Sequence, residues 1–260
     1  MKVAVVQTNP DFGNVRANIG SALALMGSVK ADLFVLPELC NTGYNFIDAA
    51  EIHQLAEPAD GATFKAIAEF TRQSSCYVVY GFAEYADSLY YNSSLLVGPE
   101  GRIGLFRKIH LFYREHLFFA PGNLGFSVFS LPFGKIGMMI CFDWIYPESA
   151  RTLALRGAQL IAHPSNLVMP YCPDAMVTRC LENRVFAVTA NRVGRENRGS
   201  NDLTYIGKSE IVSTRGEILK RLPDAQEAIA VVDVDVSQAD NKRLNEFNDL
   251  FSGRRPDQYS

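Results

Sequence analysis

The chain of 260 residues has 28 acidic and 25 basic side chains, a net charge of -3 and a pI near 5.8. This balance gives no electrostatic case for binding nucleic acid or an anionic membrane surface, so we expect neither as a partner. The hydrophobic fraction of 48% is ordinary for a globular protein. No apolar stretch approaches the ~20 residues that span a bilayer.

The cysteine usage and the N-terminus indicate the cellular compartment. The five cysteines are odd in number and irregularly spaced, and no CxxC pair occurs, so the sequence indicates neither a disulfide framework nor a zinc site. The apolar run that begins after Met1 is too short and too soon broken for a signal peptide. We therefore expect a cytoplasmic protein with reduced thiols.

Strand-like and helical patterns alternate along most of the chain. Apolar runs typical of strands cover residues 2–8, 33–36, 77–84, 91–97, 103–107, 127–131, 136–141, 160–163, 187–191 and 228–234. Helical patterns cover residues 14–28, 62–73, 147–156 and 173–186. This interleaving predicts the α/β class, although the pattern does not give the number of sheets. No linker or repeat interrupts it, so we expect a single domain over residues 1–260.

The first candidate site residue is Glu38, in the sequence Leu36-Pro37-Glu38-Leu39 directly after the apolar run 33–36. An acid at the end of a core strand must be paired, hydrogen-bonded or protonated. A salt bridge or a helix cap would satisfy it. The functional alternative is a general base, with a pKa raised by burial and lowered by a neighbouring cation.

Lys108 is the second candidate. It follows the run 103–107 and precedes the aromatic pairs Phe112-Tyr113 and Phe118-Phe119. A lysine among aromatic residues usually lies at the surface. The functional alternative is an ammonium in a dry site, where it stabilises an anionic addition intermediate and lowers the pKa of a nearby thiol. Glu115, seven residues further on, is a candidate carboxylate partner.

Cys141 is the third candidate. It ends the run 136–141, and Pro147 opens a helical pattern soon after. A sharp strand-to-helix turn exposes a nucleophile and leaves the next backbone N–H free to bind an oxyanion. A lone cysteine is more often a small buried apolar residue. However, an acid, an ammonium and a thiol at separate strand ends are the components of an acyl-transfer site, and together they favour a hydrolase.

Other functional classes find less support. A papain-like protease would pair the cysteine with a histidine such as His163, but the sequence context of papain's cysteine is absent. The four histidines lack metal-binding spacing, so we expect neither a metal nor another cofactor. Gly207-Lys208-Ser209 ends like a phosphate-binding Walker A loop, but Asp202 stands where its first glycine should be. A binding protein without activity is the non-enzyme alternative.

The three candidates lie in motifs that resemble those of the nitrilase, or carbon–nitrogen hydrolase, superfamily. The motifs are Leu36-Pro37-Glu38-Leu39, Arg107-Lys108-Ile109-His110-Leu111-Phe112 and Cys141-Phe142-Asp143-Trp144-Ile145-Tyr146-Pro147-Glu148. Further similar segments are Asn41-Thr42-Gly43-Tyr44, His163-Pro164-Ser165-Asn166 and Arg179-Cys180-Leu181-Glu182-Asn183-Arg184. The resemblance covers essentially the whole chain. It implies a four-layer αββα sandwich that pairs into an αββααββα homodimer.

The C-terminal tail, from about residue 245 to 260, carries large apolar residues but is too short for a core of its own. Its composition alone leaves open whether it packs on its own domain or crosses to a partner subunit. The resemblance implies that it packs on the partner.

The resemblance also implies the catalytic roles. It places the general base at Glu38, the oxyanion stabiliser at Lys108, the nucleophile at Cys141 and the family's second glutamate at Glu115. In the implied reaction the Cys141 thiolate attacks a carbonyl carbon, and the oxyanion lies between the Lys108 ammonium and the backbone N–H of Phe142.

The neighbours of Cys141 favour an amidase. True nitrilases of the family typically have Trp-Glu after the cysteine, whereas this chain has Phe142-Asp143, as in the amidase and carbamoylase-like branches. Omega-amidases usually carry an arginine where this chain has Ile145. We expect a small, largely apolar substrate pocket formed by Tyr44, Tyr113, Phe142, Trp144, Ile145 and Asn166. The expected substrate is a short neutral aliphatic amide, with small aliphatic nitriles and N-carbamoyl amines or amino acids as alternatives.

Overall fold

The computed structural model describes residues 1–259, and within them six strands form the first sheet in the order β14-β1-β2-β3-β4-β5. Their bounds are Lys2–Gln7 (β1), Leu33–Val35 (β2), Tyr77–Ala86 (β3), Leu89–Gly98 (β4), Gly101–Arg107 (β5) and Ala228–Asp233 (β14). β1, β2 and β3 are parallel, whereas β4, β5 and β14 pair antiparallel with their neighbours.

The second sheet in this part of the chain has the order β13-β12-β9-β8-β7-β6. Its strands are Val128–Leu131 (β6), Gly134–Met138 (β7), Leu160–Pro164 (β8), Phe186–Ala190 (β9), Glu210–Val212 (β12) and Ile218–Arg221 (β13). β7, β8 and β9 are parallel. A hairpin of β10 (Arg195–Arg198) and β11 (Asn201–Thr204) belongs to neither sheet.

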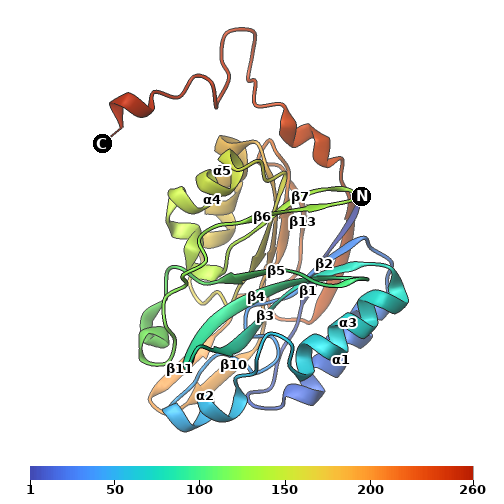
Figure 1. Cartoon of the computed structure of the whole chain (residues 1–260), viewed down its shortest axis with the longest axis vertical. Helices are drawn as coiled ribbons and strands as arrows, with labels where there is room; N and C mark the ends of the chain where they lie inside the picture. Colours follow the sequence, from blue (N-terminus) through green and yellow to red (C-terminus); the bar gives the residue numbers. More distant parts are fainter. Residues whose placement is uncertain (260) are drawn as a thin grey trace.

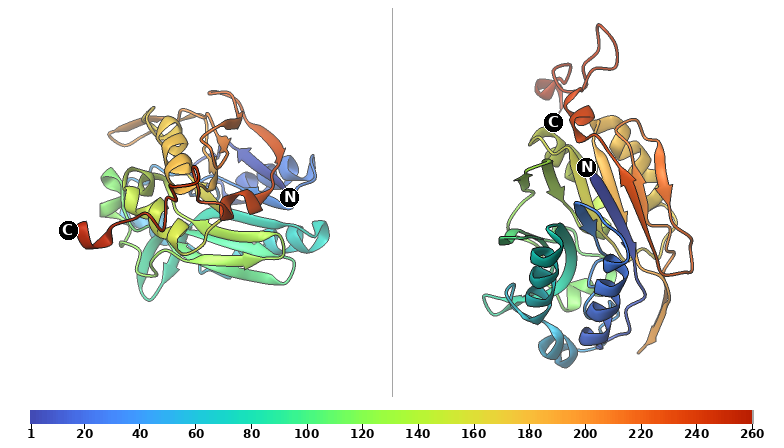
Figure 2. Two further views of the ribbon diagram at one scale, coloured as in Figure 1. Left: turned by 90° about the horizontal axis from the view of Figure 1, so that it is seen from above. Right: turned by 90° about the vertical axis from the view of Figure 1, so that its right-hand side faces the viewer.

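The two sheets pack face to face, and helices cover their outer faces (Figures 1 and 2). α1 (Val15–Gly27) and α3 (Ala62–Ser74) lie on the first sheet, whereas α4 (Pro147–Leu155) and α5 (Cys172–Asn183) lie on the second. These layers are those of the predicted αββα sandwich. No helix within residues 1–259 combines the length and the hydropathy needed to cross a membrane.

The inner strands are buried on both faces. In β1, Val3 and Val5 belong to the core that contains the second sheet, whereas Ala4 and Val6 belong to the core under α1 and α3. Successive side chains of a strand point to opposite faces, so a strand between two apolar layers must be apolar at each position. This requirement explains why such strands read as continuous apolar runs in the sequence.

Two predicted elements around the site differ from the structure. The run expected over 136–141 ends earlier, because β7 stops at Met138 and Cys141 instead begins a 3-10 helix, Cys141–Ile145. The helix expected over 173–186 begins at Cys172 and ends at Asn183. Arg184 then adopts a left-handed conformation with φ of 50°, which breaks the helix before β9.

The C-terminal segment leaves the body of the sandwich after the 3-10 helix Val236–Asp240 (Figures 1 and 2). It carries Phe247 with 86% of its surface exposed, whereas Phe251, further along the segment, packs back on the core of its own chain beside Arg151. Position 260, the end of the expected tail, lies outside the described residues.

Candidate active site

Three loops bring Glu38, Lys108 and Glu115 into one buried ion cluster. Lys108 Nζ donates to Glu38 Oε1 at 2.7 Å and to Glu115 Oε1 at 2.6 Å. All three side chains are almost completely buried. Because little solvent screens them, the ammonium and the two carboxylates interact more strongly than a surface pair would.

Glu38 lies in a turn that follows β2 and packs on Gly81 of β3. The N–H of Gly81 donates to Pro37 O at 3.1 Å, and its carbonyl accepts from Cys40 N at 3.1 Å. A Cβ atom at position 81 would lie 2.5 Å from Glu38 Cα, so only glycine fits there. Asn92 Nδ2 donates to Glu38 Oε1 at 2.6 Å, whereas Glu38 Oε2 is buried with no partner among the described residues. The unpartnered oxygen is free to accept a proton.

Lys108 is held through its backbone at the end of β5. Its N–H donates to Asn92 O at 2.8 Å, and its carbonyl accepts from Gly122 N at 2.8 Å. Burial acts to lower the pKa of Lys108, but the carboxylates of Glu115 and Glu38 raise it above its ordinary value. The ammonium therefore stays charged at neutral pH, in a site where its field is weakly screened.

Cys141 begins its 3-10 helix in a strained backbone conformation, with φ of 42°. Side chains hold the turn: Asp143 Oδ2 accepts from Ile140 N at 2.9 Å, and His163 Nε2 lies 2.9 Å from the Cys141 carbonyl oxygen. The first N–H groups of a helix have no partner within it, so the N–H of Phe142 is left without an intrahelical acceptor. The turn thus has the geometry expected around a nucleophile.

The Cys141 thiol keeps its proton at rest. Burial raises its pKa well above the ordinary value and Glu38 adds to the rise, whereas Lys108 and the backbone N–H of Asn166, which donates to the sulfur, oppose it. Burial also raises the pKa of Glu38, against the effect of Lys108 and with the help of Glu115. A protonated thiol beside a carboxylate of raised proton affinity suits base-assisted attack.

His163 does not act as a base toward this thiol. Its Nε2 faces the Cys141 carbonyl, and its Nδ1 lies 3.1 Å from Thr189 Oγ1. Burial lowers the pKa of His163 to about 4, although the bond to the Cys141 carbonyl acts in the opposite direction. The ring is neutral and both nitrogens are occupied, so the structure does not form a papain-like cysteine–histidine pair.

The expected pocket residues Phe142, Trp144 and Asn166 lie together beside Cys141. They line a pocket of about 20 Å³, which the aromatic ring of Phe112 helps to enclose. A space of this size holds about one water molecule, so even a small substrate reaches the sulfur only when the lining side chains move.

Two further expected pocket residues, Tyr44 and Tyr113, line a second small pocket beside Glu115. The Tyr44 hydroxyl donates to Glu115 Oε1 at 2.6 Å, so it contacts the ion cluster directly. Ile145 lines neither of these pockets, and 41% of its surface is exposed. The structure therefore does not bring Ile145 to the others.

The sequence interpretation missed Asn92. This residue holds the Glu38 carboxylate with its side chain and the Lys108 backbone with its carbonyl. The available signal was the run Asn92-Ser93-Ser94, fully buried polar residues inside the apolar run 91–97. Buried polar side chains need partners, so such an interruption points to a polar site.

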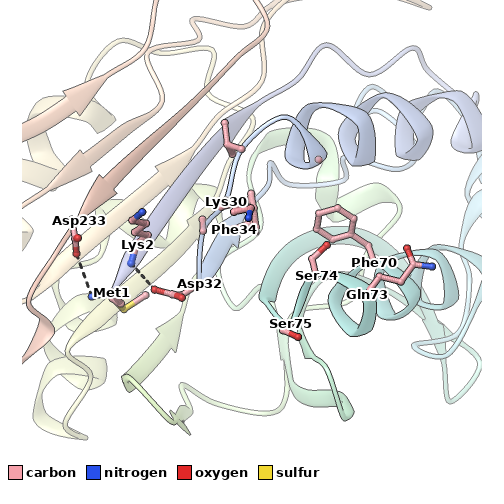
Figure 3. Close-up of a pocket in the computed structure, with 13 residues that line it drawn as sticks. Met1, Lys2, Lys30, Asp32, Phe34, Phe70, Gln73, Ser74, Ser75 and Asp233 are labelled. Carbon is pink, nitrogen blue, oxygen red and sulfur yellow. Dashed lines mark hydrogen bonds and ion pairs between the residues drawn. The ribbon is translucent and has the colours of Figure 1, made fainter.

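A larger cleft lies at the opposite end of β2, near the C-termini of α1 and α3 (Figure 3). It has a volume of about 750 Å³, but both of its carboxylates already have partners. The N-terminal ammonium lies 3.4 Å from Asp233 Oδ1, and the Lys2 N–H donates to Asp32 Oδ2 at 2.6 Å. The cleft includes none of the ion-cluster residues, so its size alone does not make it the active site.

Metal ligands are not gathered at this site. Among residues 1–259, no group of three or more His, Cys, Asp or Glu side chains is arranged to hold a metal ion. The carboxylates of Glu38 and Glu115 share the Lys108 ammonium instead.

Comparison with known proteins identifies the family. The family model described as carbon-nitrogen hydrolase matches residues 2–243. The chain belongs to this family. It is therefore a hydrolase that acts on carbon–nitrogen bonds, and the family prediction from the three motifs is confirmed.

Individual members of the family match over almost their full lengths. A nitrilase of Pyrococcus abyssi is 49% identical over 263 residues, covering 100% of this chain and 99% of the relative. An (R)-stereoselective amidase of Pseudomonas is 35% identical over 243 residues, covering 92% of this chain and 86% of the relative. The crystal structure of a carbon–nitrogen hydrolase from Helicobacter pylori aligns with a TM-score of 0.90 and 25% identity, over 100% of this chain and 97% of that chain. The αββα sandwich is thus confirmed.

Proposed function

We propose that this carbon–nitrogen hydrolase converts small neutral aliphatic amides to a carboxylate and ammonia through a thioester on Cys141. The contact between Lys108 Nζ and Glu38 Oε1 at 2.7 Å, beside the protonated thiol, supports this proposal most strongly. A base, an oxyanion stabiliser and a nucleophile therefore lie together in one buried site.

In the first half of the reaction Glu38 takes the thiol proton as the Cys141 sulfur attacks the amide carbon. The C=O electrons move to oxygen, and the oxyanion is stabilised by the Lys108 ammonium and the N–H of Phe142. When the oxyanion collapses, the C–N bond breaks and Glu38 gives its proton to the departing nitrogen. Ammonia leaves, and a thioester joins the acyl group to Cys141.

In the second half of the reaction the same carboxylate acts as the general base for water. Glu38 removes a proton from a water molecule, and the oxygen attacks the thioester carbon. The second oxyanion occupies the same position near Lys108. Its collapse breaks the C–S bond, releases the acid, and returns the proton from Glu38 to the Cys141 thiolate. One amide and one water thus give one carboxylic acid and one ammonia.

The lining of the pocket favours a short neutral acyl group. Phe142, Trp144 and Leu167 supply apolar surface beside the sulfur, and the space between them is small. Among the residues of this pocket none is charged. A charged substrate tail would lose hydration there without gaining a partner.

Nitrile hydrolysis is the second candidate function. It is favoured by the name of the Pyrococcus abyssi relative, which is 49% identical. The same thiol would add to the nitrile carbon, and the resulting thioimidate would be hydrolysed to the same thioester with release of ammonia. N-carbamoyl substrates are the third class.

Ammonia release from matched amide, nitrile and N-carbamoyl substrates of equal chain length tests the proposal. We expect the highest kcat/KM for propionamide or butyramide, and in the presence of hydroxylamine we expect the hydroxamate to form by capture of the thioester. Higher kcat/KM for the nitriles would replace the proposal by its alternative. An inert panel, with no acyl group trapped on Cys141 by intact-mass measurement, would instead indicate a binding protein.

We further propose that the enzyme is a homodimer whose C-terminal segment packs on the partner subunit. The exposed apolar Phe247 on a segment that leaves its own sandwich supports this arrangement. The five free cysteines fit the reducing cytoplasm, where we propose that the protein works.

Removing the residues after Asn245 is expected to weaken dimerisation. Phe247→Ala should weaken it in the same direction, because the ring loses apolar contact that only a partner can provide. Sedimentation velocity across a concentration series measures both effects. Leu89→Ala, which alters an exposed apolar residue on β4, is the matched control. Unchanged sedimentation of the truncated chain would reject the proposed role of the tail.

A further inference from the structure

The β10–β11 hairpin carries a buried acid that the reaction described above does not use. Glu196 lies in β10, yet only 5% of its surface is exposed. A carboxylate buried to this extent needs several partners.

Two of the four residues that contact the Glu196 carboxylate belong to the loop that follows the Glu38 turn. Asn45 N donates to Glu196 Oε2 at 2.8 Å, and Tyr44 N lies 3.3 Å from each carboxylate oxygen. The Tyr205 hydroxyl donates to Oε2 at 2.9 Å, and the Arg192 guanidinium pairs with Oε1. Two backbone N–H groups of the loop are therefore fixed by one carboxylate.

The loop and the carboxylate are fitted closely to each other. Gly43 has φ of 81°, and a Cβ atom there would lie 2.7 Å from Glu196 Oε1. Arg192 is held in turn, because its Nη2 donates to Pro10 O at 2.9 Å and its guanidinium lies 4.1 Å from the centre of the Tyr205 ring. The Glu196 carboxylate is thus held in place on several sides, and its contact with Tyr44 N positions the backbone of Tyr44.

Tyr44 connects this carboxylate to the ion cluster. Its hydroxyl donates to Glu115 Oε1 at 2.6 Å, and Lys108 Nζ donates to the same oxygen at 2.6 Å. The position of the Tyr44 backbone therefore decides whether the hydroxyl reaches Glu115, and Glu115 is one of the two carboxylates that orient the Lys108 ammonium.

We propose that Glu196 is a positioning residue for catalysis, acting through Tyr44 on Glu115 and Lys108. The inference rests on the proposed function for its kinetic readout. Lys108 stabilises an oxyanion that exists only after attack, so a disordered Tyr44 lowers kcat and leaves KM nearly unchanged. Replacing a residue that only supported the fold would lower stability, but its effect on kcat would not depend on the Tyr44 hydroxyl.

A double-mutant cycle between Glu196→Gln and Tyr44→Phe tests the inference. Glutamine keeps the size of the side chain but turns an amide NH₂ toward donors that need an acceptor. Each single variant should lower kcat about tenfold or more, as for a lost hydrogen bond to a charged group. The double variant should be no slower than Glu196→Gln alone, because both changes break the same connection. An unchanged kcat in Glu196→Gln, or losses that multiply in the double variant, would overturn the inference.

Two further variants complete the kinetic test. Arg195→Gln changes the neighbouring residue of the same strand, whose side chain is exposed and pairs with Asp202, and it should match the wild type. Tyr205→Phe removes only one donor to Glu196, so it is the milder variant if Glu196→Gln does not fold. It should lower kcat in the wild-type background and leave kcat unchanged in the Tyr44→Phe background. Losses that multiply here would also contradict the inference.

Alkylation of Cys141 by iodoacetamide separates this inference from the proposed function. The sulfur forms a bond to the CH₂ carbon, iodide leaves, and the thiol proton passes to Glu38, so no turnover is needed. Intact-mass measurement should show slower alkylation in Glu196→Gln and Tyr44→Phe than in the wild type and Arg195→Gln. If the substrate panel is inert, the proposed function fails and this rate alone decides the positioning role. Equal rates in all four proteins would remove that role.

Discussion

Replacing Cys141 with alanine is expected to abolish ammonia release while the protein stays folded. In a covalent mechanism the lost nucleophile has no substitute, and comparable removals lower kcat by a factor on the order of 10⁶. The change removes one sulfur atom and introduces no bulk. Alanine meets the same left-handed backbone as cysteine does, so the strain at this turn changes little.

The measurement is ammonia release from the best amide of the panel, together with circular dichroism and the thermal midpoint. Cys76→Ala is the matched control, because Cys76 is also buried but belongs to the core under α1 and α3, away from the ion cluster. We expect Cys76→Ala to retain activity. Clear ammonia release by folded Cys141→Ala would contradict the thioester mechanism. If Cys76→Ala lost activity to the same extent, the loss in Cys141→Ala could not be assigned to the nucleophile.

Glu38, Lys108 and Cys141 could be singled out from the sequence because each follows an apolar strand and lies in a motif that resembles one family. Glu38 comes after β2, Lys108 directly after β5, and Cys141 shortly after β7. A reactive side chain at a strand end is placed at the edge of a rigid sheet, and the resemblance of the three motifs to one family implied that these strand ends meet. The hydrogen bonds between the groups, such as Lys108 to Glu115, needed the structure.

The supporting residues were not predictable in the same way. Asn92 lies in the middle of β4, where its polar side chain reads as an interruption rather than a site. Glu196 is separated from Tyr44 by 152 residues, and nothing local in the sequence links an acid in a polar segment to that loop. Such partners are set by tertiary packing, which a linear pattern does not record.

The missed helix and strands, which are α2 (Ala49–Leu55), β10, β11, β12 and β13, are all short. α2 has seven residues, and β10, with the sequence Arg-Glu-Asn-Arg, has no apolar residue at all. A strand of that composition forms because Glu196 and its neighbours find partners, and not because it buries apolar surface. Ile145 was misplaced for a related reason: spacing from Cys141 along the chain does not give direction within a 3-10 helix.

Replacing Lys108 with methionine is expected to remove most activity and also to destabilise the fold. The lost ammonium deprives the oxyanion of a donor, which typically costs about 2.7–4 kcal/mol in the transition state, or about 10²–10³ in kcat. Methionine fills similar volume but leaves Glu38 and Glu115 buried without their cation. Breaking one side of a buried ion pair costs about 3–5 kcal/mol of folding free energy.

The loss of stability should depend on pH. Burial already raises the pKa of Glu38, and without Lys108 the carboxyl loses the cation that opposes this rise, so the native state binds more protons than the unfolded state. Stability then falls as pH rises above the ordinary unfolded value of about 4.3, and the variant should be closer to the wild type near pH 5 than near pH 8. Thermal midpoints at the two pH values measure the difference. Lys65→Met, on the exposed side of α3, is the matched control and should show no such dependence. A Lys108→Met protein with wild-type kcat, or with a deficit independent of pH, would contradict the role assigned to this ammonium.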